Sequence, residues 1–362
     1  MSKRLYGLDL LKTIAMVFII GLHFNYRTGA LSDFAFTDGR FYPVGISEAI
    51  FYVSVDCFVL ITGYFGIAKG EASIKRLVSL VLVVWFYSWM GLAIGLAGGA
   101  RPTLSQVIMC VLPFTAEHYW FIDVYLILSL LIPFINKVIA GIDRKHYRDI
   151  LLVCLIGFSV LPSFAPFASE IFSLGGGANI VWFIVLYLIG GYLRLYSPFE
   201  RVSNHRLSVC FIGLSLFTFF VKLAAQIAVA FAFPGKHIGG GQLYHHNSIT
   251  VIAAELLLFT MMQRLNIGDK AGRKISATAA CTFGIYLGHE HELFRTTFWQ
   301  GLVSYLPTSP VLWVIAMIGV IICVFWFFLA IEAVRKKLFS VLKIGGMENK
   351  IADFIERRGL MV

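Results

Sequence analysis

The segment LDLLKTIAMVFIIGLH, residues 8–23, decides the fold of this chain. It is almost entirely apolar, and its run extends to about residue 27, which is long enough for a helix that crosses a lipid bilayer. The basic residues before it resemble the start of a signal peptide, but no small-residue cleavage site follows. We therefore expect an uncleaved first membrane span.

The composition of the whole chain extends this conclusion. Its 362 residues are 59% hydrophobic and only 14% charged, whereas soluble domains carry about 25% charged residues. We expect an all-α, polytopic integral membrane protein with about ten transmembrane helices, because ten segments are long and apolar enough. They are residues 8–27, 45–67, 75–98, 119–141, 149–166, 178–196, 207–232, 244–264, 277–298 and 311–334.

The distribution of basic residues predicts an orientation. If the N-terminus is cytoplasmic, 24 of the 30 Lys and Arg residues fall on the cytoplasmic side of these segments and five fall outside. This asymmetry favours an N-in, C-in arrangement. We expect a membrane domain over residues 1–334 and a short cytoplasmic tail over residues 335–362. The charges are scattered among short loops, so the net charge of +10 does not indicate nucleic-acid binding.

The first span also contains ionisable residues, which cost about 2.5–3.5 kcal/mol each inside a membrane. Asp9, Lys12 and His23 all lie within it. Lys12 and His23 are separated by about 16 Å of helix rise and about three turns, so their side chains share one face at different depths. The alternative is that Asp9 and Lys12 extend to the inner interface while His23 lies among the outer headgroups.

Other polar residues interrupt later spans. Asp56 lies in the second segment, Asp123 follows Trp120 in the fourth, and the ninth contains His289 followed by Glu290. A histidine beside a carboxylate can perform acid–base chemistry near neutral pH. This pair is therefore a candidate catalytic group.

A metal site was considered for four histidines, His245, His246, His289 and His291. Their spacing matches no standard ligand motif, and neighbouring residues of a helix point apart. We therefore expect no metal.

Several segments together resemble the acyltransferase-3 family of integral-membrane acyltransferases. The family's hallmark is a basic residue, ten intervening residues and then histidine, here Lys12 and His23. Four further segments resemble family blocks and follow in the same order: DCFVLITGYF (56–65), YWFIDVYLILSLLIPFIN (119–136), VWFIVLYLIGGYLRLY (181–196) and TFGIYLGHEHELFR (282–295). The ten-span count also agrees with the family.

The chain departs from the family pattern at several points. Lys12 stands where arginine is commoner, and the cytoplasmic R-x-x-R element is reduced to Lys75 and Arg76. The family's H-E-N-P sequence is replaced by residues 289–292, HEHE. The hydrolase-like outer domain of larger members is not found after the last span, so a separate partner protein on the outer face is one way to complete the transfer.

The resemblance implies a membrane-bound O-acyltransferase in a bacterial-type plasma membrane. It would transfer an acyl group, we expect acetyl, from acyl-CoA to a hydroxyl of a cell-surface polysaccharide or lipid-linked sugar. Acetyl-CoA is then a donor substrate, and no tightly bound cofactor is expected. The expected partners are acyl-CoA, the glycan acceptor and the lipid bilayer.

The residues divide into three expected roles. His23 would act as general base or acyl carrier, with Glu290 or His289 orienting it or shuttling the proton. The cations suit phosphate binding, and the remaining polar residues would line a channel between donor and acceptor. The cations are Lys12, Lys75 and Arg76, and the channel residues are Asp56, Asp123 and Trp120.

The main alternative is a secondary transporter or flippase for a glycan or small polar substrate. Intramembrane charge also marks proton relays and substrate pathways. Transport without consumption of acetyl-CoA would favour that hypothesis.

Overall fold

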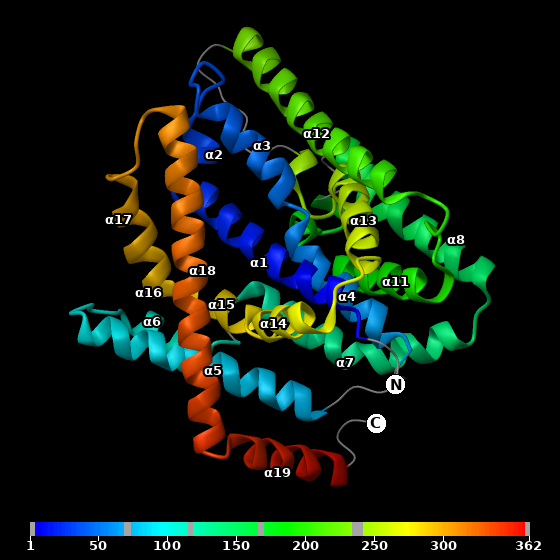
Figure 1. The fold of residues 1–362 in the computed structure, drawn as a ribbon, viewed down its shortest axis with the longest axis vertical. Coiled ribbons are helices and arrows are strands. Elements are labelled where there is room, and N and C mark those ends of the chain that lie inside the picture. The colour runs from blue at the N-terminus through cyan, green and yellow to red at the C-terminus, as the bar shows by residue number, and fades with distance from the viewer. Residues whose placement is uncertain (1–3, 69–73, 115–118, 166–169, 234–241, 359–362) are drawn as a thin grey trace.

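The structure is a computed structural model that describes residues 4–68, 74–114, 119–165, 170–233 and 242–358. All regular secondary structure in these ranges is helical, which agrees with the predicted all-α class. In Figure 1, α1 runs through the middle of the molecule, the long α18 crosses in front of it, and α19 lies at the base.

The elements follow one another along the chain as listed here. The first half contains α1 (Tyr6–Arg27), α2 (Ala30–Asp33), α3 (Phe41–Phe51), α4 (Ser54–Gly66), α5 (Ile74–Ala97), α6 (Leu104–Val111), α7 (Trp120–Ala140), α8 (Arg144–Leu155), η1 (Ile156–Val160), α9 (Leu161–Phe164), η2 (Gly175–Gly177) and α11 (Ile180–Tyr196). The second half contains α12 (Asn204–Ala232), η3 (Gln242–Tyr244), α13 (Ile249–Gln263), α14 (Asp269–Ala279), α15 (Thr282–His289), α16 (Glu292–Phe294), η4 (Arg295–Trp299), α17 (Gln300–Val303), α18 (Pro310–Val341) and α19 (Ile344–Arg357).

Seven helical stretches among the described residues are long and apolar enough to cross a membrane. They are α1, the α3–α4 pair, α5, α7, the α8–η1–α9 stretch, α12 and α18. The chain is therefore a multi-pass membrane protein. The predicted count of about ten and the N-in, C-in orientation remain predictions.

The other three predicted segments are helical but shorter or broken. α11 and α13 are apolar helices of 17 and 15 residues, and the segment 277–298 is divided among α14, α15, α16 and η4. Residue 166, the last of the fifth predicted segment, lies outside the described residues. So do residues 359–362 of the predicted tail, whose described part forms the end of α18 and α19.

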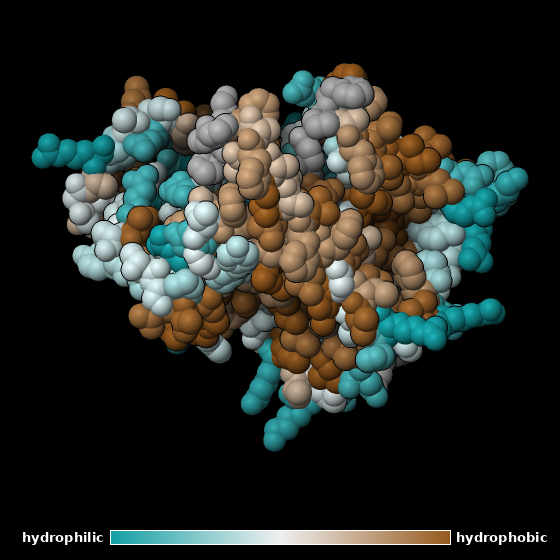
Figure 2. Space-filling view, turned by 90° about the horizontal axis from the view of Figure 1, so that it is seen from above, coloured by the Kyte–Doolittle hydropathy of each residue, from teal (hydrophilic) through white to brown (hydrophobic). Residues whose placement is uncertain are grey.

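Burial separates the central helices from the lipid-facing ones. In the most apolar 18 residues of each stretch, 61% of the residues are buried in α1 and 72% in α3–α4, whereas 28% are buried in each of α5, α12 and α18. The outer helices expose large apolar side chains such as Phe220 on α12 and Ile322 and Trp326 on α18. Figure 2 shows a broad hydrophobic surface with hydrophilic side chains gathered at its margins. Lipid is the natural solvent for such a surface.

α4 and α11 pack closely because glycines remove side chains from their interface. A Cβ added to Gly190 would lie 2.2 Å from the carbonyl oxygen of Leu60, and one added to Gly63 would lie 2.1 Å from that of Tyr187. Small residues allow such backbone approach between membrane helices. Because α4 is fixed in this way, one face of it is directed to α11 and the other to the interior cavity.

The helix that carries His289 ends inside the protein. α15 ends at His289, and the backbone N–H of Glu290 still donates to the carbonyl of Tyr286. His291 then begins α16, where its side chain accepts a hydrogen bond from the backbone N–H of Leu293. The polar sequence at 289–292 thus interrupts the predicted continuous span 277–298 between α15 and α16.

The glycine contact generates a stability prediction. Gly190→Ala should destabilise the protein by about 1–3 kcal/mol, because overpacking forces α4 and α11 apart. Gly213→Ala on α12 is the matched control, since nothing lies within 4 Å of a Cβ at that position. The measurement is the thermal aggregation midpoint of the detergent-solubilised variants. Equal midpoints for the two variants would contradict the close-packing argument.

Candidate active site

A cavity of about 1120 Å³ runs along α1 through the interior of the protein. One face of α1 lines it with Lys12, Met16, Ile19 and His23, whose spacings of four, three and four residues follow the helical repeat. Lys12 and His23 therefore face the same cavity from different depths. We call the two ends of this cavity the cationic end and the histidine end.

Five other helices form most of the remaining cavity wall. The α4 face opposite α11 contributes Val55, Phe58, Ile61, Thr62 and Phe65, and α5 contributes Arg76, Leu77 and Leu80. α7 contributes Trp120, Phe121, Ile122, Tyr125, Ser129 and Ile132, while α14 and α15 contribute Ala279, Thr282, Phe283 and Tyr286. Gly66 of α4 also lines the wall, as do Arg4 at the N-terminus and Glu356 of α19.

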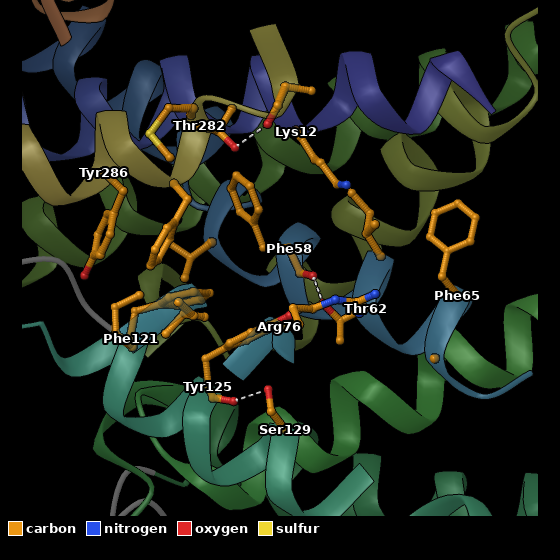
Figure 3. Close-up of a pocket in the computed structure, with 18 of the residues that line it drawn as sticks. Lys12, Phe58, Thr62, Phe65, Arg76, Phe121, Tyr125, Ser129, Thr282 and Tyr286 are labelled. Carbon is orange, nitrogen blue, oxygen red and sulfur yellow. Dashed lines mark hydrogen bonds between the residues drawn. The ribbon is translucent and has the colours of Figure 1, made fainter. Parts of the chain in front are cut away.

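Arg4, Lys12 and Arg76 form the cationic end. Arg4 Nε donates to Asp9 Oδ2 at 2.8 Å, Lys12 Nζ lies 3.8 Å from Asp9 Oδ1, and Ser276 also donates to Asp9. The hydrogen bond to Asp9 raises the pKa of Arg4 above its ordinary value, so its charge is permanent. Figure 3 shows Lys12 and Arg76 pointing into the cavity.

Two of the site residues differ from the sequence analysis at this end. Lys75 is exposed and does not line the cavity, whereas its neighbour Arg76 does. Arg4 was not singled out. Arg4 lies eight residues before Lys12 and precedes the first residue of α1. Outside the helix, the helical repeat does not predict the direction of its side chain.

The middle of the cavity is aromatic with a few hydroxyl groups. The Thr62 and Tyr125 hydroxyls lie 3.0 Å apart, and Ser129 donates to the Tyr125 carbonyl at 2.8 Å. Phe121 contacts Tyr125 and Tyr286 with ring centroids 5.8 and 5.9 Å apart. Such a wall suits a long, mostly apolar chain that carries occasional polar groups.

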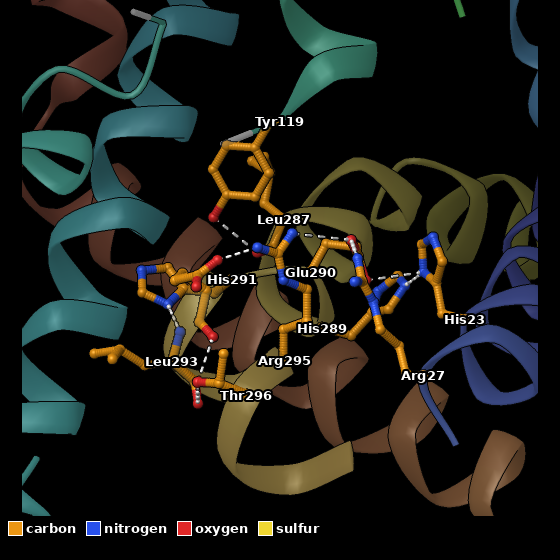
Figure 4. A network of polar contacts seen from close by, with 11 residues as sticks. His23, Arg27, Tyr119, Leu287, His289, Glu290, His291, Leu293, Arg295 and Thr296 are labelled. Atoms are coloured by element: carbon orange, nitrogen blue, oxygen red, sulfur yellow. Dashed lines mark hydrogen bonds and ion pairs between the residues drawn. The ribbon is translucent and has the colours of Figure 1, made fainter. Parts of the chain in front are cut away.

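The histidine end joins α1 to the residues that follow α15 (Figure 4). His23 Nδ1 lies 2.8 Å from His289 Nε2 and 3.3 Å from Glu290 Oε1. Arg27, one turn after His23, donates to Glu290 Oε2 at 3.0 Å, and Arg295 lies 4.0 Å from the same oxygen. Glu290 thus forms ion pairs with two arginines.

The hydrogen bonds of His289 decide which nitrogen of His23 is free. His289 Nδ1 lies 2.7 Å from the carbonyl oxygen of Ile285, which can only accept, so this nitrogen carries the proton. In the neutral ring Nε2 is then an acceptor, and His23 Nδ1 must donate to it. His23 Nε2 keeps its lone pair, and His23 rather than the fully buried His289 lines the cavity.

The three predicted channel residues are not equally placed. Trp120 lines the cavity. Asp56 is fully buried on the other face of α4, where Trp182 Nε1 donates to its Oδ2 at 2.9 Å. Asp123 is half-buried and does not line the cavity. The helical repeat places Asp56 on a different face of α4 from Val55 and Phe58. It does not show which of these faces is directed to the cavity.

The four histidines considered for a metal do not gather at one point. His291 Nε2 donates to the carbonyl of Ser88 at 3.1 Å while its Nδ1 accepts from Leu293, so both nitrogens are engaged. In the described part of the chain, the metal-type donors that lie within 4.8 Å of one another belong to His23, His289 and Glu290. The two histidine nitrogens already share a hydrogen bond, so an ion would have to displace that proton.

Comparison with known proteins agrees with this geometry. A family model described as an acyltransferase domain matches residues 5–329, nearly the whole chain. The chain belongs to the acyltransferase-3 family. This membrane acyltransferase has no match among curated proteins or solved structures. The matched region includes every cavity-lining element except Arg4 and α19.

Arg27 and Arg295 contact Glu290 at the histidine end, and sequence reasoning did not single them out. Arg27 follows His23 by four residues, a spacing that places two side chains on one helix face. That signal was present in the sequence. Arg295 approaches Glu290 only because the chain turns sharply after α15, and no local pattern predicts the turn.

The lining of the cavity generates an accessibility prediction. In a variant in which the six native cysteines are replaced, Thr62→Cys should react with a water-soluble methanethiosulfonate reagent, because Thr62 faces the cavity. Val59→Cys, three residues earlier on α4, is the control, since Val59 is fully buried in the core. The measurement is the rate of labelling. Labelling of Thr62→Cys as slow as that of Val59→Cys would show that the cavity is closed to water.

Proposed function

We propose that this acyltransferase transfers an acetyl group from acetyl-CoA to a hydroxyl of a cell-surface or lipid-linked carbohydrate, in a bacterial-type plasma membrane. The observation that carries the proposal is that a single cavity joins three cationic side chains to an imidazole with a free nitrogen. A polyanionic donor and a proton-accepting base are the two requirements of acyl transfer from coenzyme A to an alcohol.

The cationic end suits the phosphates of the donor. Arg4, Lys12 and Arg76 supply charge-assisted hydrogen bonds, and the arginines can bind phosphate oxygens in a bidentate manner. The pantetheine arm would pass Thr62 and Tyr125 toward His23. The step of eleven positions from Lys12 to His23 corresponds to about 16 Å along α1, a distance that an extended arm can cover.

The proposed reaction uses His23 Nε2 as a general base. Nε2 takes the proton of the acceptor hydroxyl while the hydroxyl oxygen forms a bond to the thioester carbonyl carbon. The carbon–sulfur bond then breaks, and the coenzyme A thiolate leaves and takes the proton back from Nε2. The same lone pair is also able to accept the acetyl group itself and pass it on in a second step.

His289 and Glu290 support this base in different ways. His289 fixes the tautomer of His23 by accepting its Nδ1 proton. Glu290, 3.3 Å from the same nitrogen, stabilises the positive charge that develops on His23. Arg27 holds the Glu290 carboxylate in place. The alternative of a transporter or flippase is not favoured by a chain that matches an acyltransferase family over residues 5–329.

The central prediction concerns His23. His23→Ala should reduce glycan acetylation by at least about a hundredfold, the typical contribution of a general base. The measurement is mass spectrometry of cell-envelope glycans from cells that lack the gene and carry either the wild-type chain or the variant. The expected difference is the loss of one acetyl unit per modified sugar.

His205→Ala is the matched control, because His205 is an exposed histidine near the start of α12. It should leave acetylation unchanged, and the membrane abundance of both variants should equal that of the wild type. Normal acetylation by the His23 variant would refute the proposed mechanism. No mass change on loss of the gene would refute the proposed function.

A second prediction separates the two neighbouring cations of α5. Arg76→Glu should raise the KM for acetyl-CoA by about tenfold or more, because it replaces a charge-assisted contact by repulsion. Lys75→Glu should change it by less than about twofold, since Lys75 lies outside the cavity. Both are measured with purified protein at saturating acceptor. Equal effects would show that bulk charge, rather than the cavity, attracts the donor.

A further inference from the structure

Beside the cavity, next to Trp120, lies a second group of aromatic and ionisable side chains that the proposed reaction does not use. We infer that Tyr52, Trp120 and His246, with Asp56 behind His246, form the subsite that binds the sugar ring of the acceptor. The inference rests on the proposed function. It names the acceptor-binding residues and the chemistry of the acceptor that they suit, a pyranose ring with hydroxyl groups.

The His246 ring contacts two aromatic side chains. Its centroid is 5.2 Å from that of Tyr52 and 6.1 Å from that of Trp120. Trp120 also lines the cavity that contains His23, so it connects the cluster around His246 to that cavity.

Two buried polar atoms face each other in this cluster without a hydrogen-bond partner. His246 Nδ1 and Asp56 Oδ1 lie 3.8 Å apart, and neither forms a hydrogen bond. The other Asp56 oxygen is fixed by Trp182 at 2.9 Å. Unsatisfied buried polar atoms are rare in folded proteins. A small shift of the His246 ring would close the gap, as a ligand bound to its other nitrogen could bring about.

The backbone around His246 is firmly held, as a binding subsite requires. Gly177 has φ of +95°, and a Cβ added to it would lie 2.9 Å from His246 Cβ. Asn247 Nδ2 donates to the carbonyl of Phe158 at 2.8 Å, and the backbone N–H of Ser248 donates to the His245 carbonyl at 3.0 Å. The position of the His246 backbone is therefore set before any acceptor arrives.

The chemistry of the cluster favours a sugar ring with hydroxyl groups. The faces of Tyr52 and Trp120 carry partial negative charge, which attracts the C–H groups on one face of a pyranose. An imidazole backed by a carboxyl group can donate to or accept from a hydroxyl. A pyranose thus fits both the aromatic faces and the imidazole.

The test compares His246→Ala, His246→Gln and Asp56→Asn in purified protein. The donor is radiolabelled acetyl-CoA, and the acceptor probe is alkali-treated envelope glycan from cells that lack the gene, added at increasing concentration. His246→Ala and Asp56→Asn should raise the glycan concentration for half-maximal rate by about tenfold. The KM for acetyl-CoA should stay within about twofold, and His246→Gln should recover part of the loss.

His245→Ala is the matched control, because the neighbouring His245 packs against Gly176 and has no contact with Asp56. It should behave like the wild type. If His246→Ala leaves the half-saturating glycan concentration unchanged, or raises the donor KM equally, the subsite is refuted. If the wild-type protein itself does not acetylate the glycan, the proposed function fails instead.

Discussion

The hydrogen bond between His23 and His289 joins two residues that are 266 positions apart, and the site depends on it. It connects the centre of the molecule, α1, to the last turn of α15. The carbonyl of Ile285 sets the direction of this bond, because it leaves His289 only one nitrogen that can accept. A backbone group on one helix thereby decides which nitrogen of a histidine on another helix is reactive.

The same constraint explains why so many ionisable groups are tolerated in a lipid environment. Two buried carboxylates beside the cavity have specific partners: Asp9 is bound by Arg4 and Ser276, and Glu290 by Arg27. On the far side of α15, Arg335 and Tyr87 both donate to Glu332. Charges that are paired and hydrogen-bonded avoid most of the penalty for burial. These parts of the polar interior are therefore small ion-paired groups.

Much of this arrangement was predictable from the sequence. The helical repeat predicted that Lys12 and His23 share a face, and local composition predicted the long apolar helices. Contacts between distant helices were not predictable. Nothing near Asp56 indicates that it turns toward Trp182 and away from the cavity. Likewise, Arg76 rather than Lys75 faces the interior because of how α5 packs, which depends on its neighbours. The helix breaks after His289 because polar residues cap its end and the start of α16. Averaging hydropathy over a long segment does not detect such caps.

α1 carries both ends of the cavity on one uninterrupted helix without proline. A helix of this kind resists stretching, because each added ångström would have to lengthen its backbone hydrogen bonds. The distance between Lys12 and His23, the proposed donor-binding cation and the proposed base, is thus fixed. In the proposed reaction, a donor with a shorter arm would stop before the imidazole, and one with a longer arm would have to fold. The proposed mechanism therefore selects the donor by the length of its arm, independently of the acyl group that the arm delivers.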